Sequence, residues 1–127
     1  MRRVFKVRYF SRWMRKTSLA HASLCKAVIE MERGLIDAEL GGGLIKQRVR
    51  LPGRGKRGSA RVLAATNRKD RWFFLYGFEK NDRDNVSDDE LEGLQEIARV
   101  LLARTPQQLD AAVTDGSLQE ICHEQTH

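Results

Sequence analysis

The chain has few of the residues that build metal sites and disulfide frameworks. It holds two cysteines and three histidines among 127 residues. Cys25 and Cys122 show no CxxC spacing, so we expect no disulfide framework and a reducing compartment. His21 lies four residues before Cys25, and His123 lies beside Cys122 and four residues before His127. Such pairs permit a metal site but are common by chance, and no HExxH motif or paired CxxC supports one, so we expect no metal and no cofactor.

Long apolar runs are also missing. Residues 1–6 are basic, but cationic side chains at Arg8, Arg12, Arg15 and Lys16 interrupt every apolar stretch that could follow them. We therefore expect no signal peptide, no membrane-spanning segment, and a cytoplasmic protein with no membrane partner.

Acidic residues are scarce in the first two thirds of the chain and basic residues in the last third. Residues 1–83 carry 21 Lys or Arg and 7 Asp or Glu, whereas residues 84–127 carry 2 and 10. The formal net charge is +6. A basic body favours a polyanionic partner such as nucleic acid, and a solvated surface is the alternative.

The first third of the chain predicts one strand and two helices. Residues 4–9 are rich in β-forming residues and predict a strand. Residues 10–16 predict a short helix and residues 20–34 a longer one, because apolar residues recur there at helical spacing. Glycines 41–43 indicate a turn.

Three strands are expected next, at residues 44–51, 59–66 and 71–78. The first alternates apolar and polar residues, which places Lys46 and Arg48 on one face. The third is apolar on both faces, which suits the centre of a sheet. The polar stretch before it predicts a hairpin turn.

The last third predicts two helices. Ser87 and Glu90 have the spacing of a capping box, and Thr105 with Pro106 begins a second helix. Asp115-Gly116 ends that helix, and the tail to residue 127 is expected to be frayed. With short connections that favour antiparallel strands, the pattern predicts a compact α+β fold.

Residues 51–61 form the most informative segment. Four of the eleven are cationic and three are glycine. Glycine lets the backbone approach a phosphate closely, and Arg54, Lys56 and Arg57 supply charge. The segment is no nucleotide-binding P-loop, because Lys and Ser or Thr do not follow its last glycine. The segment predicts contact with a nucleic-acid backbone, and a solvated basic turn is the alternative. Any catalysis there would have to proceed without histidine.

Further candidates lie on the two strands after this loop. Arg61 is expected to point into a cleft, or else to be an edge-strand charge that blocks aggregation. Tyr76, Phe78 and Lys80 share one side of the next strand, and Lys80 and Asn81 leave it near the loop. An aromatic ring that stacks on a base beside cations is a common way to hold single-stranded RNA. Core packing is the alternative for the two rings.

Two motifs together resemble one known family. Gly-Arg-Gly-Lys-Arg-Gly-Ser-Ala-Arg at 53–61 and Phe-Phe-Leu-Tyr-Gly-Phe-Glu-Lys-Asn at 73–81, followed by an acidic capped helix, are similar to the RelE/HigB-like toxins of bacterial type II toxin–antitoxin modules, within the RelE/ParE superfamily. Residues 31–35 and 42–46 are similar as well, and the resemblance covers about residues 3–104.

The resemblance implies a small RelE-like fold of the microbial-ribonuclease type. It has an N-terminal strand and two helices, then a three-stranded antiparallel segment that completes the sheet, with C-terminal helices. Residues 1–104 would be the toxin domain and 105–127 a helical extension and tail. The implied activity is a metal-independent endoribonuclease that cuts mRNA in the ribosomal A site and inhibits translation. The implied partner is a cognate antitoxin encoded nearby, often of the helix-turn-helix type.

The resemblance also implies roles for individual residues. Lys56 and Arg57 would sit on the scissile phosphate, Arg61 would stabilise the transition state, and Lys80 would be a base or phosphate ligand. No residue matches a general acid of the family, and Lys56 qualifies as a base where neighbouring cations lower its pKa. The substrate contacts expected beside them are Arg54, Tyr76, Phe78, Asn81, Lys46 and Arg48.

Two other functions remain open at this level. A ParE-like toxin would keep the fold but bind and poison DNA gyrase without nuclease activity. A non-catalytic nucleic-acid-binding module would bind in a salt-dependent manner and release no product. The density of cations in the loop favours the nuclease, since a protein–protein inhibitor has less need of them.

Overall fold

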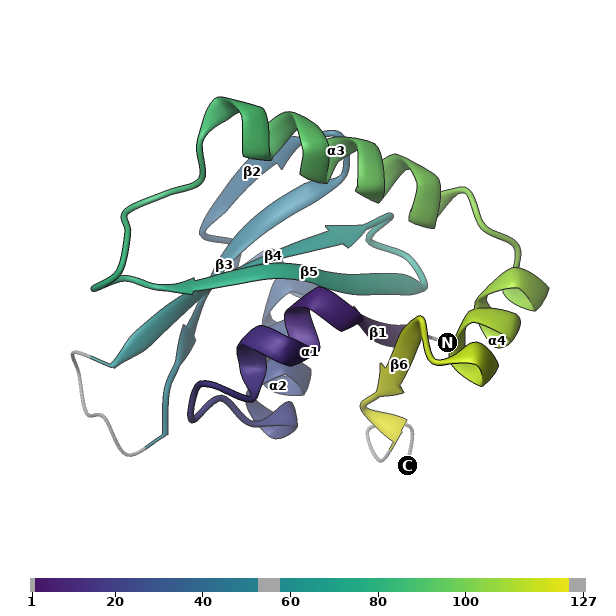
Figure 1. Cartoon of the computed structure of the whole chain (residues 1–127), viewed down its shortest axis with the longest axis horizontal. Helices are drawn as coiled ribbons and strands as arrows, with labels where there is room; N and C mark the ends of the chain where they lie inside the picture. The colour runs from purple at the N-terminus through teal and green to yellow at the C-terminus, as the bar shows by residue number, and fades with distance from the viewer. Residues whose placement is uncertain (1, 53–57, 124–127) are drawn as a thin grey trace.

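The computed structural model describes residues 2–52 and 58–123, which form an α+β fold with helices on both faces of a mixed sheet (Figure 1). The six strands lie in the order β2-β3-β4-β5-β1-β6. The elements are β1 (Arg3–Val7), α1 (Arg8–Met14), α2 (His21–Glu32), β2 (Ala38–Gly41), β3 (Leu44–Arg50), β4 (Ser59–Thr66), β5 (Arg71–Glu79), α3 (Asp88–Leu102), α4 (Pro106–Asp115) and β6 (Leu118–Ile121).

The centre of the sheet is an antiparallel unit of three strands. β3 pairs with β4 and β4 with β5, so that Arg48, Arg61 and Phe78 lie side by side across the three strands. β1 then joins β5 in parallel, and β6 pairs antiparallel with β1. A β-bulge gives β5 one extra residue, Leu75, opposite the step from Leu63 to Ala64. The three strands expected from the sequence are confirmed, with β3 one residue shorter and β5 one residue longer.

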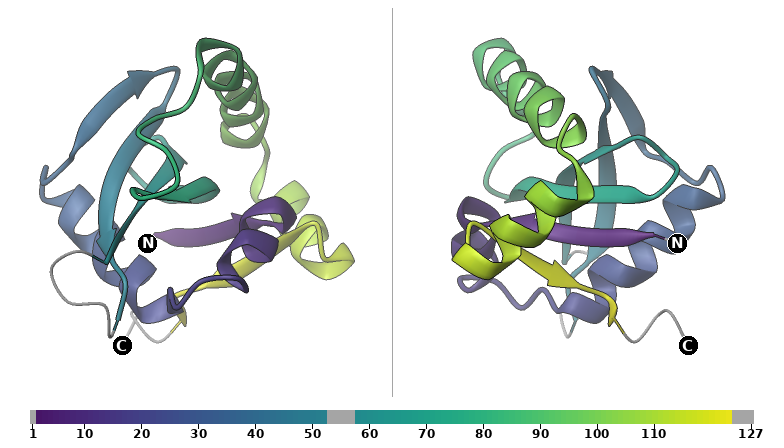
Figure 2. Two further views of the ribbon diagram at one scale, coloured as in Figure 1. Left: turned by 60° about the vertical axis from the view of Figure 1, so that its left-hand side comes forward. Right: turned by 90° about the vertical axis from the view of Figure 1, so that its right-hand side faces the viewer.

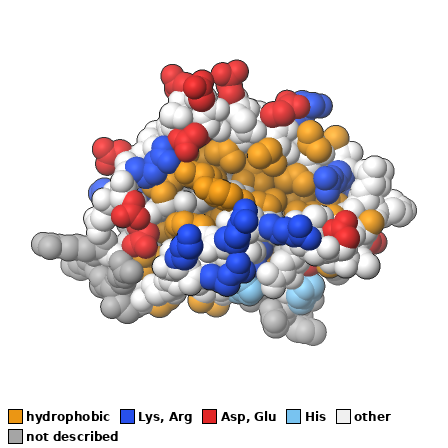
Figure 3. All heavy atoms as spheres, viewed as in Figure 1, with side chains coloured by type: hydrophobic (Ala, Val, Ile, Leu, Met, Phe, Trp, Pro, Cys, Tyr) orange, Lys and Arg blue, Asp and Glu red, His pale blue; other side chains and the backbone are white. Residues whose placement is uncertain are grey.

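Each face of the sheet has its own apolar core. Ile45 and Val49 of β3 pack in the core beneath α1 and α2, whereas Leu44 packs in the core beneath α3 and α4, as the alternation in this strand predicts. Figure 2 shows α2 and α3 on opposite sides of the sheet. In Figure 3 apolar side chains stay visible between α3 and the Lys and Arg side chains gathered below it, so this core is not closed on every side.

Two N-terminal elements differ from the expectation. α1 begins at Arg8 directly after β1, so Tyr9 is helical and not part of the first strand. β2 was not expected, because it is only four residues long and half exposed. It forms a hairpin with β3, and three successive glycines with positive φ, Gly41–Gly43, make the turn between them.

The C-terminal helices begin and end as the sequence predicts, but the tail does not fray where expected. Both capping boxes form, and α4 ends at Gly116 with a left-handed φ of 83°. The residues after it form β6, because Leu118 and Ile121 bury their side chains and Arg3 Nε lies 2.9 Å from Glu120 Oε2. This strand corrects the expectation of a frayed tail for residues 118–121.

The two cysteines correct a second expectation. Cys25 of α2 and Cys122 after β6 form a disulfide, with 5.6 Å between their Cα atoms. They are 97 residues apart in the sequence, so the pairing cannot be predicted from local spacing. The bond ties the end of β6 to the helix that covers the first core.

Candidate nucleic-acid interface

Two adjacent rows of side chains cross β3, β4 and β5 on the face that carries α3. One row is Arg48, Arg61 and Phe78, and the next, two residues along each of β3 and β4, is Lys46, Leu63 and Tyr76. Residues two apart on a strand share a face, so both rows point to the same side of the sheet. The structure thus brings together five residues that the sequence singled out: Lys46, Arg48, Arg61, Tyr76 and Phe78.

Arg61 lies in the middle of this face and is held from two sides. Its Nη1 donates to Ser59 Oγ at 3.3 Å, and its Nε lies 3.7 Å from Asp37 Oδ2. The side chain is only 11% exposed, so the guanidinium is fixed close to the sheet. A cation in this position presents a preorganised charge to a phosphate that settles on the face.

Tyr76 has its hydroxyl in a charged network. The hydroxyl oxygen accepts from Arg83 Nη1 at 2.9 Å, and it donates to Glu90 Oε2 at 3.2 Å. The Tyr76 ring stacks on Tyr9 of α1, with centroids 5.6 Å apart and 9° between the planes. Burial raises the pKa of Tyr76, with Glu90 adding to the shift and Arg83 opposing it. The phenol therefore stays protonated at neutral pH and is a hydrogen-bond donor.

Arg83 and Glu90 are functional candidates that the sequence analysis missed. Arg83 Nη1 donates to Glu90 Oε2 at 3.0 Å, and Nη2 donates to Oε1. The guanidinium also lies 5.8 Å from the Phe78 ring centroid and 6.0 Å from that of Tyr76. Hydrogen bonds from Arg83 and from the backbone of Ser87 lower the pKa of Glu90 to about 2. Glu90 was predicted only as a capping residue. Arg83 lies in the same polar stretch as the predicted site residue Asn81, and this proximity is the signal that could have identified Arg83.

The other predicted residues of this strand and its turn differ in burial: Phe78 is buried, whereas Lys80 and Asn81 are exposed. Phe78 is 4% exposed and packs in the core beneath α3, which the sequence analysis kept as its alternative. Lys80 and Asn81 are exposed in the turn after β5. The Lys80 amide donates to Ser59 O at 3.4 Å, so the turn lies beside the start of β4. The structure leaves Tyr76 and Tyr9, and not Phe78, as the accessible rings.

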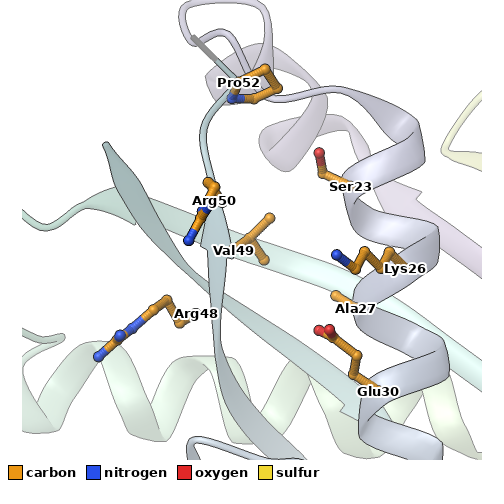
Figure 4. A pocket seen from close by; sticks show the side chains of 8 residues that line it. All are labelled: Ser23, Lys26, Ala27, Glu30, Arg48, Val49, Arg50 and Pro52. Atoms are coloured by element: carbon orange, nitrogen blue, oxygen red, sulfur yellow. The ribbon is translucent and has the colours of Figure 1, made fainter. Parts of the chain in front are cut away.

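Cations continue around the edge of β3. A cavity of about 480 Å³ separates Arg48 and Arg50 of β3 from Lys26 of α2 (Figure 4). Both arginines are exposed, and no carboxylate of the described residues lies within ion-pair distance of either. Glu30 of α2 also lines the cavity and offsets part of its positive charge.

Three of the predicted site residues, Arg54, Lys56 and Arg57, lie outside the described residues. Of the residues on either side of them, the amide of Leu51 donates to Gly58 O at 2.8 Å. This bond continues the pairing of β3 with β4 by one step beyond Arg50 and Ser59. Leu51 and Gly58 thus lie at the end of the sheet where Lys80 also lies.

The candidate metal ligands have other roles or fall outside the structure. Cys25 and Cys122 are bonded to each other, and His127 is not described. In residues 2–52 and 58–123 no three His, Cys, Asp or Glu side chains come together in a way that could hold a metal. In the same two ranges no helix has the length and apolar composition needed to cross a membrane.

Comparison with known proteins gives one family. The family model described as "RelE toxin of RelE / RelB toxin-antitoxin system" matches residues 2–121, nearly the whole chain and all ten elements. No curated protein matches the chain.

Proposed function

Because the chain belongs to the RelE toxin family, we propose that it is an endoribonuclease that cuts mRNA in the ribosomal A site and so stops translation. Membership makes it a toxin of a toxin–antitoxin system with an antitoxin partner. The cleavage, the ribosome as its location and a helix-turn-helix antitoxin are parts of the proposal.

The observation that carries the proposal is the pair of rows on one face of the sheet. Lys46, Arg48 and Arg61 place three positive charges on the same face of the sheet as Tyr76. Cations fixed on a rigid sheet stabilise charge that develops on a phosphate without having to reorganise during the reaction. Arginine adds a forked donor that fits phosphate oxygens.

The reaction fits these groups. The ribose 2′-oxygen attacks its own 3′-phosphate, the bond from phosphorus to the 5′-oxygen breaks, and the products are a 2′,3′-cyclic phosphate and a 5′-hydroxyl. The 2′-hydroxyl proton passes to a base, for which Lys56 and Lys80 are the candidates, and a proton passes to the leaving 5′-oxygen. Arg61 stabilises the phosphorane and Arg57 contacts the phosphate. Tyr76 is the candidate donor to the leaving group when its hydroxyl turns from Glu90 to the leaving oxygen.

Primer extension on a reporter mRNA in a translating extract tests the proposal. Wild-type protein should give discrete cuts that depend on ribosomes, and Arg61→Ala and Lys56→Ala should lose them. Lys69→Ala, in the exposed hairpin between β4 and β5, removes the same charge away from the face and should cut normally. Intact mRNA with normal translation would overturn the proposal, and inhibition of gyrase by the same protein would then identify a ParE-like toxin.

A further inference from the structure

A cavity of about 490 Å³ lies where the end of β6 meets the start of α2. Both cysteines of the disulfide line it, and so do two of the three histidines of the chain. Two thiolates with two imidazoles are a common donor set of tetrahedral zinc sites. The side chains that bring this donor set to the cavity are His21, Cys25, Cys122 and His123.

The backbone brings a histidine and a cysteine to the cavity from each side. His21 and Cys25 are four residues apart on α2, so they lie one turn apart on the same face of the helix. On the other side, Cys122 has a left-handed φ of 68°, which residues other than glycine seldom adopt. The chain bends there, directly after β6, and Cys122 and His123 both line the cavity although they are adjacent in the sequence.

The spacing of the two cysteines suits a shared ion as well as a bond. Their Cα atoms are 5.6 Å apart. Two thiolates on one tetrahedral zinc ion, each about 2.3 Å from the metal, lie about 3.8 Å from each other, which rotation of the two side chains can reach. With the bond closed both sulfurs are occupied, and across the described ranges no three ligand side chains come together. Only the reduced chain therefore offers the full donor set.

His123 is held in an orientation that suits a metal ligand. Its Nε2 lies 3.0 Å from the carbonyl oxygen of Glu120, and Nε2 carries the proton of this hydrogen bond because a carbonyl oxygen only accepts. In the neutral ring the lone pair is then on Nδ1. Histidines that bind metals commonly donate their second nitrogen to a backbone carbonyl in this way. Charge also balances, because two thiolates neutralise a divalent ion and neutral imidazoles add none.

We propose that the reduced chain binds one zinc ion through these two cysteines and two histidines, and that the disulfide is the oxidised form of the same site. A dithiol reductant opens the bond: it becomes a disulfide itself, and two electrons and two protons pass to Cys25 and Cys122. Zinc then displaces both thiol protons to solvent as the thiolates bind.

The ion would join the same two elements as the disulfide does. It ties α2 to the end of β6, so this connection persists in a reducing compartment where the bond is open. β1 separates β6 from β5 in the sheet, so the ion lies away from the cationic face and takes no part in cleavage. The inference therefore does not depend on the proposed function.

Cobalt is the probe for the test, because Co²⁺ in a tetrahedral thiolate site has strong absorption bands that the hydrated ion lacks. The full chain is stripped of metal with a chelator, reduced with a phosphine and titrated with Co²⁺. We expect thiolate-to-cobalt charge-transfer bands that saturate at one ion per chain. Zinc should abolish these bands by displacing cobalt, and the oxidised chain should not show them.

Variants test the two histidines separately from the cysteines. His21→Ala and His123→Ala should each weaken zinc binding by about tenfold or more, measured in competition with a chromophoric chelator. Gln119→Ala is the matched control, since it removes a side chain from the same cavity that is not in the donor set, and it should leave the affinity unchanged.

Three results would overturn the proposal: no charge-transfer bands in the reduced chain, the same bands in the oxidised chain, or unchanged zinc affinity in both histidine variants. Where reduction unfolds the metal-free chain, zinc should refold it, as followed by circular dichroism. A reduced chain that stays unfolded with zinc present would overturn the proposal as well.

Discussion

Arg83 and Glu90 form a two-point ion pair that also holds the hydroxyl of Tyr76. Arg83 thus acts as a positioning residue for Tyr76. Arg83→Lys keeps the charge but loses the planar fork that binds the carboxylate and the phenol at once. We expect kcat for RNA cleavage to fall about tenfold with little change in KM, because substrate attraction depends on charge and the chemistry on geometry.

Arg99→Lys is the control for this prediction, because Arg99 pairs with Glu96 on the exposed side of α3. It should leave both constants unchanged. Equal kcat for Arg83→Lys and wild type would show that the position of the Tyr76 hydroxyl does not matter for cleavage.

The same ion pair predicts a pH dependence of stability. The pKa of Glu90 is lowered from 4.5 to about 2 in the folded chain. A carboxylate with a depressed pKa adds stability that is fully present above pH 4.5 and is lost as the pH falls toward 2. Glu90→Gln should therefore reduce stability at pH 7 and flatten its decline between pH 5 and pH 2 in urea titrations. Glu92→Gln, on the same helix but outside this network, should keep the wild-type slope.

The disulfide predicts a redox dependence of stability. A cross-link between Cys25 and Cys122 closes a loop of 97 residues, and such a loop contributes about 2–4 kcal/mol. Reduction, or Cys25→Ser, should lower the free energy of unfolding by that amount, and the reductant should then have no effect on the variant. Two thiols that react with Ellman's reagent in the folded, non-reduced protein would show that the bond is absent.

Gly77 lies where the sheet has no room for a larger side chain. A Cβ at this position would lie 2.4–2.6 Å from three atoms of the Trp13 ring, which is rigid and packs against Phe10. Gly77→Ala should therefore cost about 1–3 kcal/mol in the free energy of unfolding. Gly93→Ala, in the middle of α3 with open space around it, should stabilise by about 0.5–1 kcal/mol. A neutral Gly77→Ala would mean that Trp13 is free to move.

Elements with a strong local pattern could be predicted from the sequence. The alternation from Leu44 to Leu51 and the capping boxes at Ser87 and Thr105 depend on near neighbours, and all three are confirmed. β2 and β6 could not, because short strands are stabilised by partners far along the chain. β6 depends on β1 and on the bond from Arg3 to Glu120, and the disulfide depends on the same fold.

In the candidate site, too, features set by local sequence could be predicted and features set by distant parts of the chain could not. Residue type and strand spacing sufficed to single out Arg61 and Tyr76, which the register brings to neighbouring rows. The partners of Tyr76 could not be predicted, since Tyr9 lies in α1 but was expected at the end of the first strand. Glu90 serves two roles at once, as its Oε1 accepts from the Ser87 amide at 2.8 Å while its carboxylate also pairs with Arg83. The division at residue 104 into two parts stays a prediction.

The central claim is that the cationic face of β3, β4 and β5 cuts RNA, and single-turnover cleavage of a reporter mRNA on programmed ribosomes tests it most directly. Arg48→Ala and Arg61→Ala should each slow cleavage, by at least a hundredfold for Arg61→Ala, as expected for loss of a transition-state charge. Lys69→Ala should cleave at the wild-type rate, with the same 2′,3′-cyclic phosphate and 5′-hydroxyl ends. Cleavage by Arg61→Ala at the wild-type rate, or equal losses for Arg61→Ala and Lys69→Ala, would contradict the account.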